Sequence, residues 1–391
     1  MLTKVSIARV FPEYLQWNSL VSPAVGEVLG RNLSDWQREF RESNNIPPHK
    51  PVIMVGHQPT FFHPGILAKF IAANRIAKQV GGVVVFLVAD HYIGNATAVE
   101  FCVSGNHLKL ETKQISTLDA TISLKDQPRV KASENVNPFT DALKNASGDN
   151  AAMQIANALV LLMEPFACVN HVVPASALLE SSFGNAMLEE MQRDSEYCIE
   201  AYNTALTTAP SNGIPFLNQM ELPLWEGITN QKLETGFDLR PRALTLTLLA
   251  RLIGCDLFVH GTGGYAYDKS MEHWCSTWLD AKPCHAVMVT ASLRLPLQMQ
   301  TWTDARREYF SPPFDIPTKE IFLNAISSAE YGSPQRQVHF QEMRRWLETI
   351  QLPLDKTDYI EDTQIAMKRN WAFPLYCEDQ LHNLVKEINE L

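Results

Sequence analysis

The chain between residues 52 and 90 contains two apolar runs separated by a segment with helical spacing. Residues 52–56 (VIMVG) and 83–90 (VVVFLVAD) are short and almost wholly apolar. Residues 66–82 place apolar side chains at intervals of three and four and end in two glycines. Short apolar runs predict strands buried on both faces, and the spacing between them predicts a helix. The order strand, helix, strand therefore predicts a βαβ unit in a parallel sheet.

A second unit of the same kind is expected nearer the C-terminus. Residues 241–254 (PRALTLTLLARLIG) predict a helix that ends at a glycine, and residues 255–261 (CDLFVHG) predict a strand. Residues 261–274 predict a loop entering a helix, and residues 285–297 predict a further strand. The expected fold class is α/β: a Rossmann-like parallel sheet core with a largely helical insertion and a helical C-terminal tail.

The chain has 391 residues, which is more than one hydrophobic core usually fills. A mainly helical pattern over residues 149–208 separates the two predicted halves of the core. The expected parts are an N-terminal extension at 1–50, the first half of the core at 51–103, an inserted mixed and helical region at 104–229, the second half at 230–300 and a helical C-terminal region at 301–391.

Composition and charge narrow the class of protein. The formal net charge is -10, which argues against non-specific nucleic-acid binding. The seven cysteines form no C-x-x-C pair, so we expect reduced thiols in a cytoplasmic protein. No signal-peptide core and no apolar run of roughly 18 residues is present, so no membrane partner is expected. The expected partners are small molecules, and the oligomeric state stays open.

Three polar stretches follow the predicted strands: residues 56–65 (GHQPTFFHPG), 89–95 (ADHYIGN) and 260–269 (HGTGGYAYDK). In βαβ units, ligands collect beyond the carboxyl ends of the strands, where helix N-termini suit phosphate or carboxylate groups. We therefore expect four histidines and one aspartate to line one cleft there. They are His57, His63, Asp90, His91 and His260.

Each of these residues also has a simpler interpretation. A single histidine at a strand end is commonly a structural hydrogen-bonding group, and the glycines of these stretches can serve tight turns. Asp90 and Asp268 can cap helices or pair with Arg240 or Lys269. The histidines also suit zinc, but no H-x-x-x-H pair and no cysteine pair is present, so no tightly bound metal is expected.

Residues 56–91 resemble the N-terminal Rossmann region of the BshC family, the cysteine-adding enzymes of bacillithiol biosynthesis. The family has a glycine–glutamine loop after its first strand, a helix bearing a lysine, and a strand that ends in an acidic residue and a histidine. The matching positions here are Gly56, Gln58, Lys69, Asp90 and His91.

A second match is the segment FDLRPRALTLTLLARLIGCDLFVHGTGGYAYD, where the family has a similar helix and a glycine-rich loop followed by an aromatic residue. The equivalents are Arg240, Gly263, Gly264 and Tyr267. The chain departs from the family in two ways: it has no long heptad segment, and its first loop carries His57 and His63.

The BshC core in turn resembles class I aminoacyl-tRNA synthetases, whose His-x-Gly-His loop binds ATP phosphates. His63 and Gly65 match that loop, and Ile66 replaces its second histidine. The resemblance thus implies ATP with Mg²⁺ as the cofactor.

The leading hypothesis is a BshC-like ligase that joins an amino acid, cysteine in the family, to an amine of a small molecule after nucleotide-dependent activation of the carboxylate. The catalytic candidates are His57, His63, Asp90 and His91, with His91 as general base. The binding candidates are Gly56, Gln58, Gly65, Lys69, Asn95, Arg240, His260, Gly261, Gly263, Gly264, Tyr267 and Asp268. The alternatives are a metal-dependent amidohydrolase that uses the four histidines, and a non-catalytic nucleotide- or metabolite-binding protein.

Overall fold

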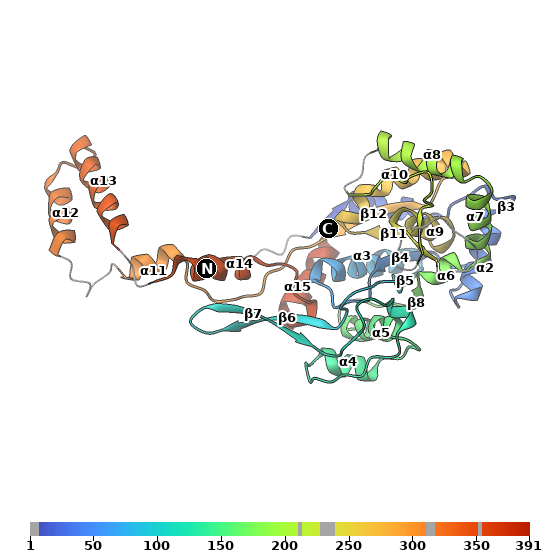
Figure 1. The fold of residues 1–391 in the computed structure, drawn as a ribbon, viewed down its shortest axis with the longest axis horizontal. Coiled ribbons are helices and arrows are strands. Elements are labelled where there is room, and N and C mark those ends of the chain that lie inside the picture. Colours follow the sequence, from blue (N-terminus) through green and yellow to red (C-terminus); the bar gives the residue numbers. More distant parts are fainter. Residues whose placement is uncertain (1–7, 210–212, 227–238, 310–316, 351–353) are drawn as a thin grey trace. The chain divides into compact units, whose positions relative to one another are not determined.

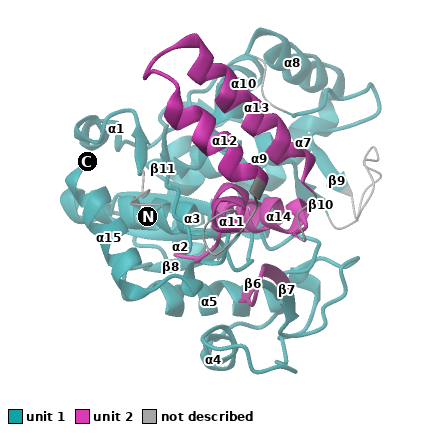
Figure 2. Ribbon diagram, turned by 90° about the vertical axis from the view of Figure 1, so that its left-hand side faces the viewer, with its two compact units in different colours: residues 1–100, 112–295, 369–391 teal, residues 101–111, 296–368 magenta. Residues whose placement is uncertain are grey.

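The computed structural model describes residues 8–209, 213–226, 239–309, 317–350 and 354–391. The chain forms two compact units, which Figure 2 distinguishes by colour. Unit 1 comprises residues 1–100, 112–295 and 369–391, and unit 2 comprises residues 101–111 and 296–368.

Unit 1 is built on a six-stranded sheet (Figure 1). The strand order is β1 (Arg9–Phe11), β12 (His285–Thr290), β11 (Leu257–His260), β4 (Val52–His57), β5 (Val83–Val88) and β8 (His171–Pro174). Neighbouring strands are parallel except for β1, which pairs antiparallel with β12. The α/β, Rossmann-like fold class is thereby confirmed.

Two crossover helices connect the four central strands. Helix α3 (Pro64–Val80) joins β4 to β5, and helix α10 (Thr262–Leu279) joins β11 to β12. Strands β4 and β11 lie side by side. The connection from β4 leads to β5, toward one edge of the sheet, and the connection from β11 leads to β12, toward the other edge. The order of the strands therefore reverses between β4 and β11, and such a reversal point is where open α/β sheets bind ligands.

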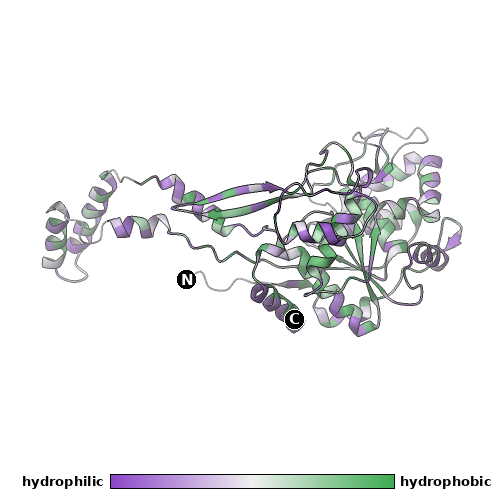
Figure 3. Cartoon of the chain, turned by 90° about the horizontal axis from the view of Figure 1, so that it is seen from below, coloured by the Kyte–Doolittle hydropathy of each residue, from purple (hydrophilic) through white to green (hydrophobic). Residues whose placement is uncertain are grey.

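Apolar side chains cover both faces of the sheet, as expected for runs without polar alternation. Val52 and Met54 belong to a core cluster shared with α2 and with α7 to α10. On the opposite face, Phe86 of β5 meets Phe70 of α3 with ring centroids 5.0 Å apart. Figure 3 shows the strands of the sheet as predominantly hydrophobic.

The remaining helices of unit 1 surround this sheet. They are α1 (Trp17–Leu20), α2 (Leu33–Ser43), α4 (Phe139–Asn145), α5 (Ala151–Met163), α6 (Ser176–Leu179), α7 (Ser182–Arg193), α8 (Ser195–Thr208), α9 (Ala243–Leu249) and α15 (Glu378–Glu390). Three short strand pairs complete the elements: β2 (Glu27–Val28) with β3 (Arg31–Asn32), β9 (Leu224–Glu226) with β10 (Leu239–Pro241), and β6 (Ala98–Ser104) with β7 (Leu108–Gln114).

Two segments expected outside the core contribute strands to it. The region 104–229, expected as an insertion, supplies β8, which pairs with β5, and the region 1–50 supplies β1. Both strands are only three or four residues long, too short to produce an apolar run. Residues 230–238 of the predicted second half of the core lie outside the described residues.

Unit 2 consists of four helices and the tip of the β6–β7 hairpin. The helices are α11 (Trp302–Tyr309), α12 (Pro317–Ser328), α13 (Pro334–Thr349) and α14 (Lys356–Met367). His107 Nδ1 at the hairpin tip lies 2.8 Å from Asp362 Oδ2 of α14, and the Leu108 N–H donates to Asp362 Oδ1. In the parts of the chain that the structure describes, no helix is both long and apolar enough to span a bilayer.

Candidate functional site

A cavity of about 380 Å³ lies at the reversal point of the sheet. The carboxyl ends of the central strands line it. Gly56 and His57 are the last two residues of β4, His260 is the last residue of β11, and Thr290 is the last residue of β12. The N-termini of both crossover helices also contribute to its wall. The cavity therefore occupies the place where parallel α/β sheets bind their ligands.

The first turn of α3 forms one side of the cavity. His63 is the N-cap, and its Nδ1 accepts a hydrogen bond from the Gly65 N–H at 3.0 Å. Pro64 occupies the first helical position, where its missing N–H costs nothing. A Cβ at residue 65 would lie 2.8 Å from the Ala291 carbonyl oxygen, so only glycine lets the helix start this close to the chain after β12.

Lys69, one turn further along α3, is buried and lines the cavity. Its Nζ donates to the Gly56 carbonyl oxygen at 2.8 Å, and among the described residues no carboxylate forms an ion pair with it. Burial lowers the pKa of Lys69 to about 7. The wall of the cavity thus holds an amino group that has no carboxylate partner within the part of the chain that the structure describes.

His57 presents a neutral ring to the same space. Its Nδ1 lies 2.8 Å from the Gln58 carbonyl oxygen, which can only accept a hydrogen bond, so Nδ1 carries the proton. Nε2 of the neutral ring is then a hydrogen-bond acceptor. Burial, together with the charge of Lys69, lowers the pKa of His57 to about 3. Burial and the charges of Lys69 and Arg369 also lower the pKa of His63.

The lowered pKa of His57 predicts an acid-sensitive contribution to stability. Between pH 6.5 and about 3 the unfolded chain binds a proton at this position that the folded chain does not, so stability falls as the pH falls through this window. Urea unfolding between pH 7 and 4 should therefore show a shallower loss of stability for His57→Gln than for wild type. His49→Gln, at an exposed histidine, should keep the wild-type slope; equal slopes for all three proteins would contradict the expectation.

The glycine-rich stretch after β11 is the first turn of a helix, not a loop. Gly261 is the N-cap of α10, and Gly263 and Gly264 have helical conformations without positive φ. A Cβ at Gly261 or Gly263 would meet nothing within 4 Å, whereas a Cβ at Gly264 would overlap the His260 ring. Gly264 is therefore required for close packing of the helix on His260, and the expectation that these glycines form an irregular loop is wrong.

Asp90 and His91 do not line the cavity. The Asp90 carboxylate accepts hydrogen bonds from the Ser176 N–H at 3.0 Å and from Ser176 Oγ at 2.6 Å. Although burial raises the pKa of Asp90, its bonds with His91 and Ser176 lower it below the ordinary value overall. Asp90 thus holds the start of α6, which is the capping alternative noted for it.

The other predicted residues divide between the cavity and the rest of unit 1. Asn95 is outside, where its amide pairs with that of Gln114, and Arg240 is buried on β10. Asp268 lies behind His260 and does not line the cavity. The predicted residues that do line it are Gly56, His57, Gln58, His63, Gly65, Lys69, His260, Gly261, Gly263, Gly264 and Tyr267.

Sequence reasoning missed three polar lining residues, Thr247, Thr262 and Thr290. Thr290 is the last residue of β12, so its position after the apolar run HAVMV was a usable signal. Thr262 lies between Gly261 and Gly263, which were both predicted. Thr247 lies on α9, and nothing in its local sequence distinguishes it from a core threonine. The three residues add hydroxyl groups to a wall that also carries imidazole and ammonium groups.

The C-terminal segment closes the loop between β4 and α3. The Phe373 N–H donates to the Phe62 carbonyl oxygen at 2.8 Å, and the two rings stack with centroids 5.5 Å apart. Tyr376 donates to the Leu293 carbonyl oxygen at 3.1 Å. The conformation of the loop that carries His57 and His63 therefore depends on residues near the end of the chain.

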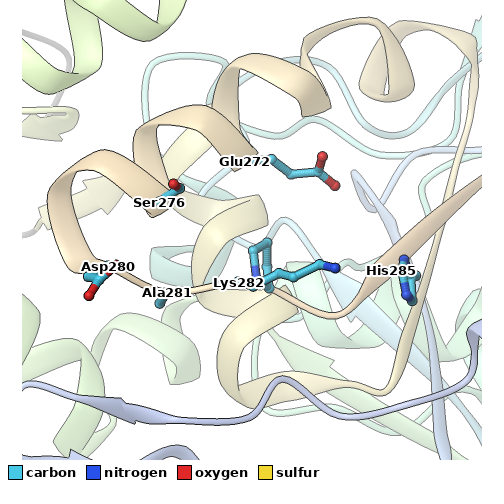
Figure 4. A pocket seen from close by; sticks show the side chains of 7 residues that line it. Glu272, Ser276, Asp280, Ala281, Lys282 and His285 are labelled. Carbon is cyan, nitrogen blue, oxygen red and sulfur yellow. The ribbon is translucent and has the colours of Figure 1, made fainter.

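A second, larger cavity of about 610 Å³ lies near the other edge of the sheet, at the amino end of β12. Figure 4 shows its ionisable lining residues: Glu272 and Asp280 on or beside α10, Lys282 on the segment leading into β12, and His285 at the start of β12. None of the predicted site residues lines it. The charged groups around this second cavity are exposed. The cavity at the reversal point is the better candidate site, because it borders the buried Lys69, which has no carboxylate partner among the described residues.

No group of three or more His, Cys, Asp or Glu side chains in the described ranges is arranged to hold a metal ion. The four histidines that the hydrolase alternative requires are therefore not assembled as a ligand set. His91 lies outside the cavity lining, and His260 faces Asp268.

Comparisons with known proteins add little to this description. No family model matches the chain, and no curated protein matches it. A solved structure, the tyrosyl-tRNA synthetase of Archaeoglobus fulgidus complexed with L-tyrosine, aligns with 97% of this chain and 99% of its own, at 10% sequence identity and a TM-score of 0.30. This likeness is so slight that we infer nothing about the site from it.

Proposed function

We propose that the cavity at the reversal point binds the phosphates of ATP, and that the protein is a ligase that joins an amino acid to an amine of a small molecule. The observation that supports this is the buried Lys69 ammonium, which borders a cavity and has no carboxylate partner among the described residues. A buried charge without a counter-ion is costly, and an anionic ligand would remove that cost.

Two helix N-termini add to the attraction for an anion. The first turns of α3 and α10 border the same cavity as Lys69. Helix N-termini attract phosphate and carboxylate groups through free N–H groups and through the positive end of the helix dipole. The start of α3 contributes only its dipole, because Pro64 has no N–H and the Gly65 N–H donates to His63 Nδ1. This positive site lies in a chain with a formal net charge of -10, so the attraction is local rather than a property of the whole protein.

The residues fit a nucleoside triphosphate. When bound, ATP supplies the phosphoryl or adenylyl group that activates a carboxylate. Lys69 and the N–H groups in the first turn of α10 would hold the phosphates and stabilise the negative charge that develops there. Mg²⁺ commonly binds through the phosphates themselves with few protein carboxylates, so the proposal requires no preformed metal group in the protein.

His57 Nε2 would accept a hydrogen bond from the incoming amine and orient it. This atom accepts because Nδ1 donates to the Gln58 carbonyl oxygen, and the ring is neutral at pH 7. Because the pKa of His57 is lowered to about 3, the ring does not retain the proton of the amine, which would pass to water. His91, first expected as the general base, lies outside the cavity lining. The resemblance to the BshC family supports cysteine as the amino acid.

The ligase can be tested with hydroxylamine as a small surrogate amine. The protein, ATP, Mg²⁺ and cysteine should form cysteine hydroxamate, detected by mass spectrometry, and the reaction should stop when ATP is omitted. The other amino acids are compared in parallel. ATP binding without hydroxamate from any amino acid would instead support the non-catalytic alternative, which the position of His91 already favours. No ATP binding would contradict both.

Anion binding should be linked to proton uptake. A bound phosphate stabilises the charged form of Lys69 and raises its pKa from about 7 towards the ordinary value of 10.5. At pH 8, binding should therefore take up a proton, and affinity should decrease as the pH rises above 7. Titration calorimetry with ATP in two buffers of different ionisation enthalpy measures the uptake. A Lys69→Met protein that took up the same number of protons would show that another group is responsible.

A further inference from the structure

We propose that Asp268 is a positioning residue that holds His260 with its Nδ1 open to the cavity as a hydrogen-bond acceptor. This inference rests on the proposed function, since it assigns a role within the same site. His260 was expected to bind substrate or nucleotide directly, and so was Asp268. Only His260 lines the cavity, and Asp268 acts from behind it.

His260 is the last residue of β11 and is 5% exposed. Its Nε2 lies 3.1 Å from Oδ2 of Asp268, which is on α10 and is 3% exposed. Two elements joined by a tight connection thus present a histidine and a carboxylate to each other in the interior. The contact is an ion-pair distance without hydrogen-bond alignment, so the carboxylate acts on the Nε2 side of the ring through its charge.

Arg251 fixes the carboxylate in turn. Its Nη1 lies 3.0 Å from the same Oδ2 of Asp268, and its Nε donates to the Cys284 carbonyl oxygen at 2.8 Å. Its Nη2 lies 2.6 Å from Glu272 Oε1. Because the guanidinium is planar and contacts three groups, it restricts rotation of Asp268.

The ionisation of Asp268 determines which nitrogen of His260 carries the proton. Burial raises the pKa of Asp268, but His260, when it is protonated, and the Arg251 guanidinium lower it overall. An ionised carboxylate only accepts hydrogen bonds, so the Nε2 facing it carries a proton. A neutral His260 ring then has its lone pair on Nδ1.

Gly264 lets the first turn of α10 pack against this atom. A Cβ at residue 264 would overlap Nδ1 of His260, so no side chain covers Nδ1 from that position. His260 and Gly264 both line the cavity. A donor group of a bound ligand, such as an amine, would approach Nδ1 from the cavity side.

The protonation of His260 can be read directly by ¹⁵N NMR of the imidazole rings in the unliganded wild-type protein, with His260→Gln to assign the signal. We expect the neutral ring to carry its proton on Nε2. A neutral ring with the proton on Nδ1, or a ring that stays charged over the whole pH range of the folded protein, would overturn the proposal. This measurement tests the position of the proton on His260 even if the protein does not bind ATP.

Two matched variants test the functional consequence. Asp268→Asn should reduce hydroxamate formation at saturating ATP at least tenfold, with ATP affinity changed less than threefold. Asp256→Asn is the control, because Asp256 is also buried and pairs with Arg41 at 2.8 Å, but at the amino end of β11. It should lower the melting temperature without changing the His260 signal. Equal effects of the two variants on the reaction and on that signal would reduce Asp268 to a structural role.

Discussion

Replacing Lys69 with methionine should weaken ATP binding at least tenfold and leave the protein at least as stable as wild type. Methionine keeps most of the volume of the side chain and removes its charge. Each charge-assisted hydrogen bond is worth about 1.5–3 kcal/mol, so the loss of the ammonium should weaken binding about 10- to 100-fold, and more if Lys69 contacts two phosphates.

The effect on stability follows from the pKa. Lowering the pKa of Lys69 from 10.5 to about 7 means that the fold disfavours the charged form by about 5 kcal/mol. Leaving the Gly56 carbonyl oxygen without its donor costs about 1–3 kcal/mol. Lys69→Met should therefore stabilise the protein at pH 6. The gain should shrink at pH 9, because the folded wild type has by then released the proton.

Calorimetric titration with ATP and thermal unfolding at pH 6 and pH 9 measure both quantities. Lys78→Met is the control, since Lys78 is exposed in the last turn of the same helix. Wild-type affinity in the Lys69 variant would remove the role that we assign to this lysine. A loss of stability at pH 6 would show that the buried ammonium has a partner that compensates its charge.

Gly264→Ala should damage the site, and Gly263→Ala should not. The methyl group at residue 264 would overlap the His260 ring, which is buried and held by Asp268, so helix or ring must move. Overpacking of this kind costs about 1–3 kcal/mol. At residue 263 the methyl group would enter open space, and replacing a helical glycine by alanine typically stabilises by about 0.4–1 kcal/mol.

The two alanine variants can be compared by melting temperature and by ATP affinity. We expect a lower melting temperature and at least tenfold weaker binding for Gly264→Ala, and a raised melting temperature with retained binding for Gly263→Ala. Equal losses of binding in both variants would point to a ligand that approaches the backbone of the whole turn. Normal binding by Gly264→Ala would mean that His260 is not part of the site.

The central fold was predictable because the strands on both sides of the reversal point are buried on both faces. Val52–Val55 and Val83–Val88 are apolar without interruption, and the helix between them ends at a left-handed Gly81. The short strands β1 and β8 were not predictable, because three or four residues carry no periodicity. Their place in the sheet is set by tertiary pairing with β12 and β5.

The site was predictable only in part, and the reason is geometric. A polar residue after a parallel strand lies at the correct edge of the sheet, which placed His57 and His260 at the cavity. The same rule failed for Asp90, because a carboxylate at that edge can equally hold the start of α6. The contact of Arg251 with Asp268 joins residues on two helical segments, and no local pattern encodes it.

The contact between Phe62 and Phe373 has a consequence for biosynthesis. The loop that carries His57 and His63 emerges from the ribosome early, but the backbone group that closes it is translated several hundred residues later. At typical rates of synthesis this delay is on the order of tens of seconds. During that time a nascent chain can assemble the βαβ unit around Lys69 while the loop still lacks its last hydrogen bond. The loop that carries His57 and His63 is therefore among the last parts of the core to reach its final form.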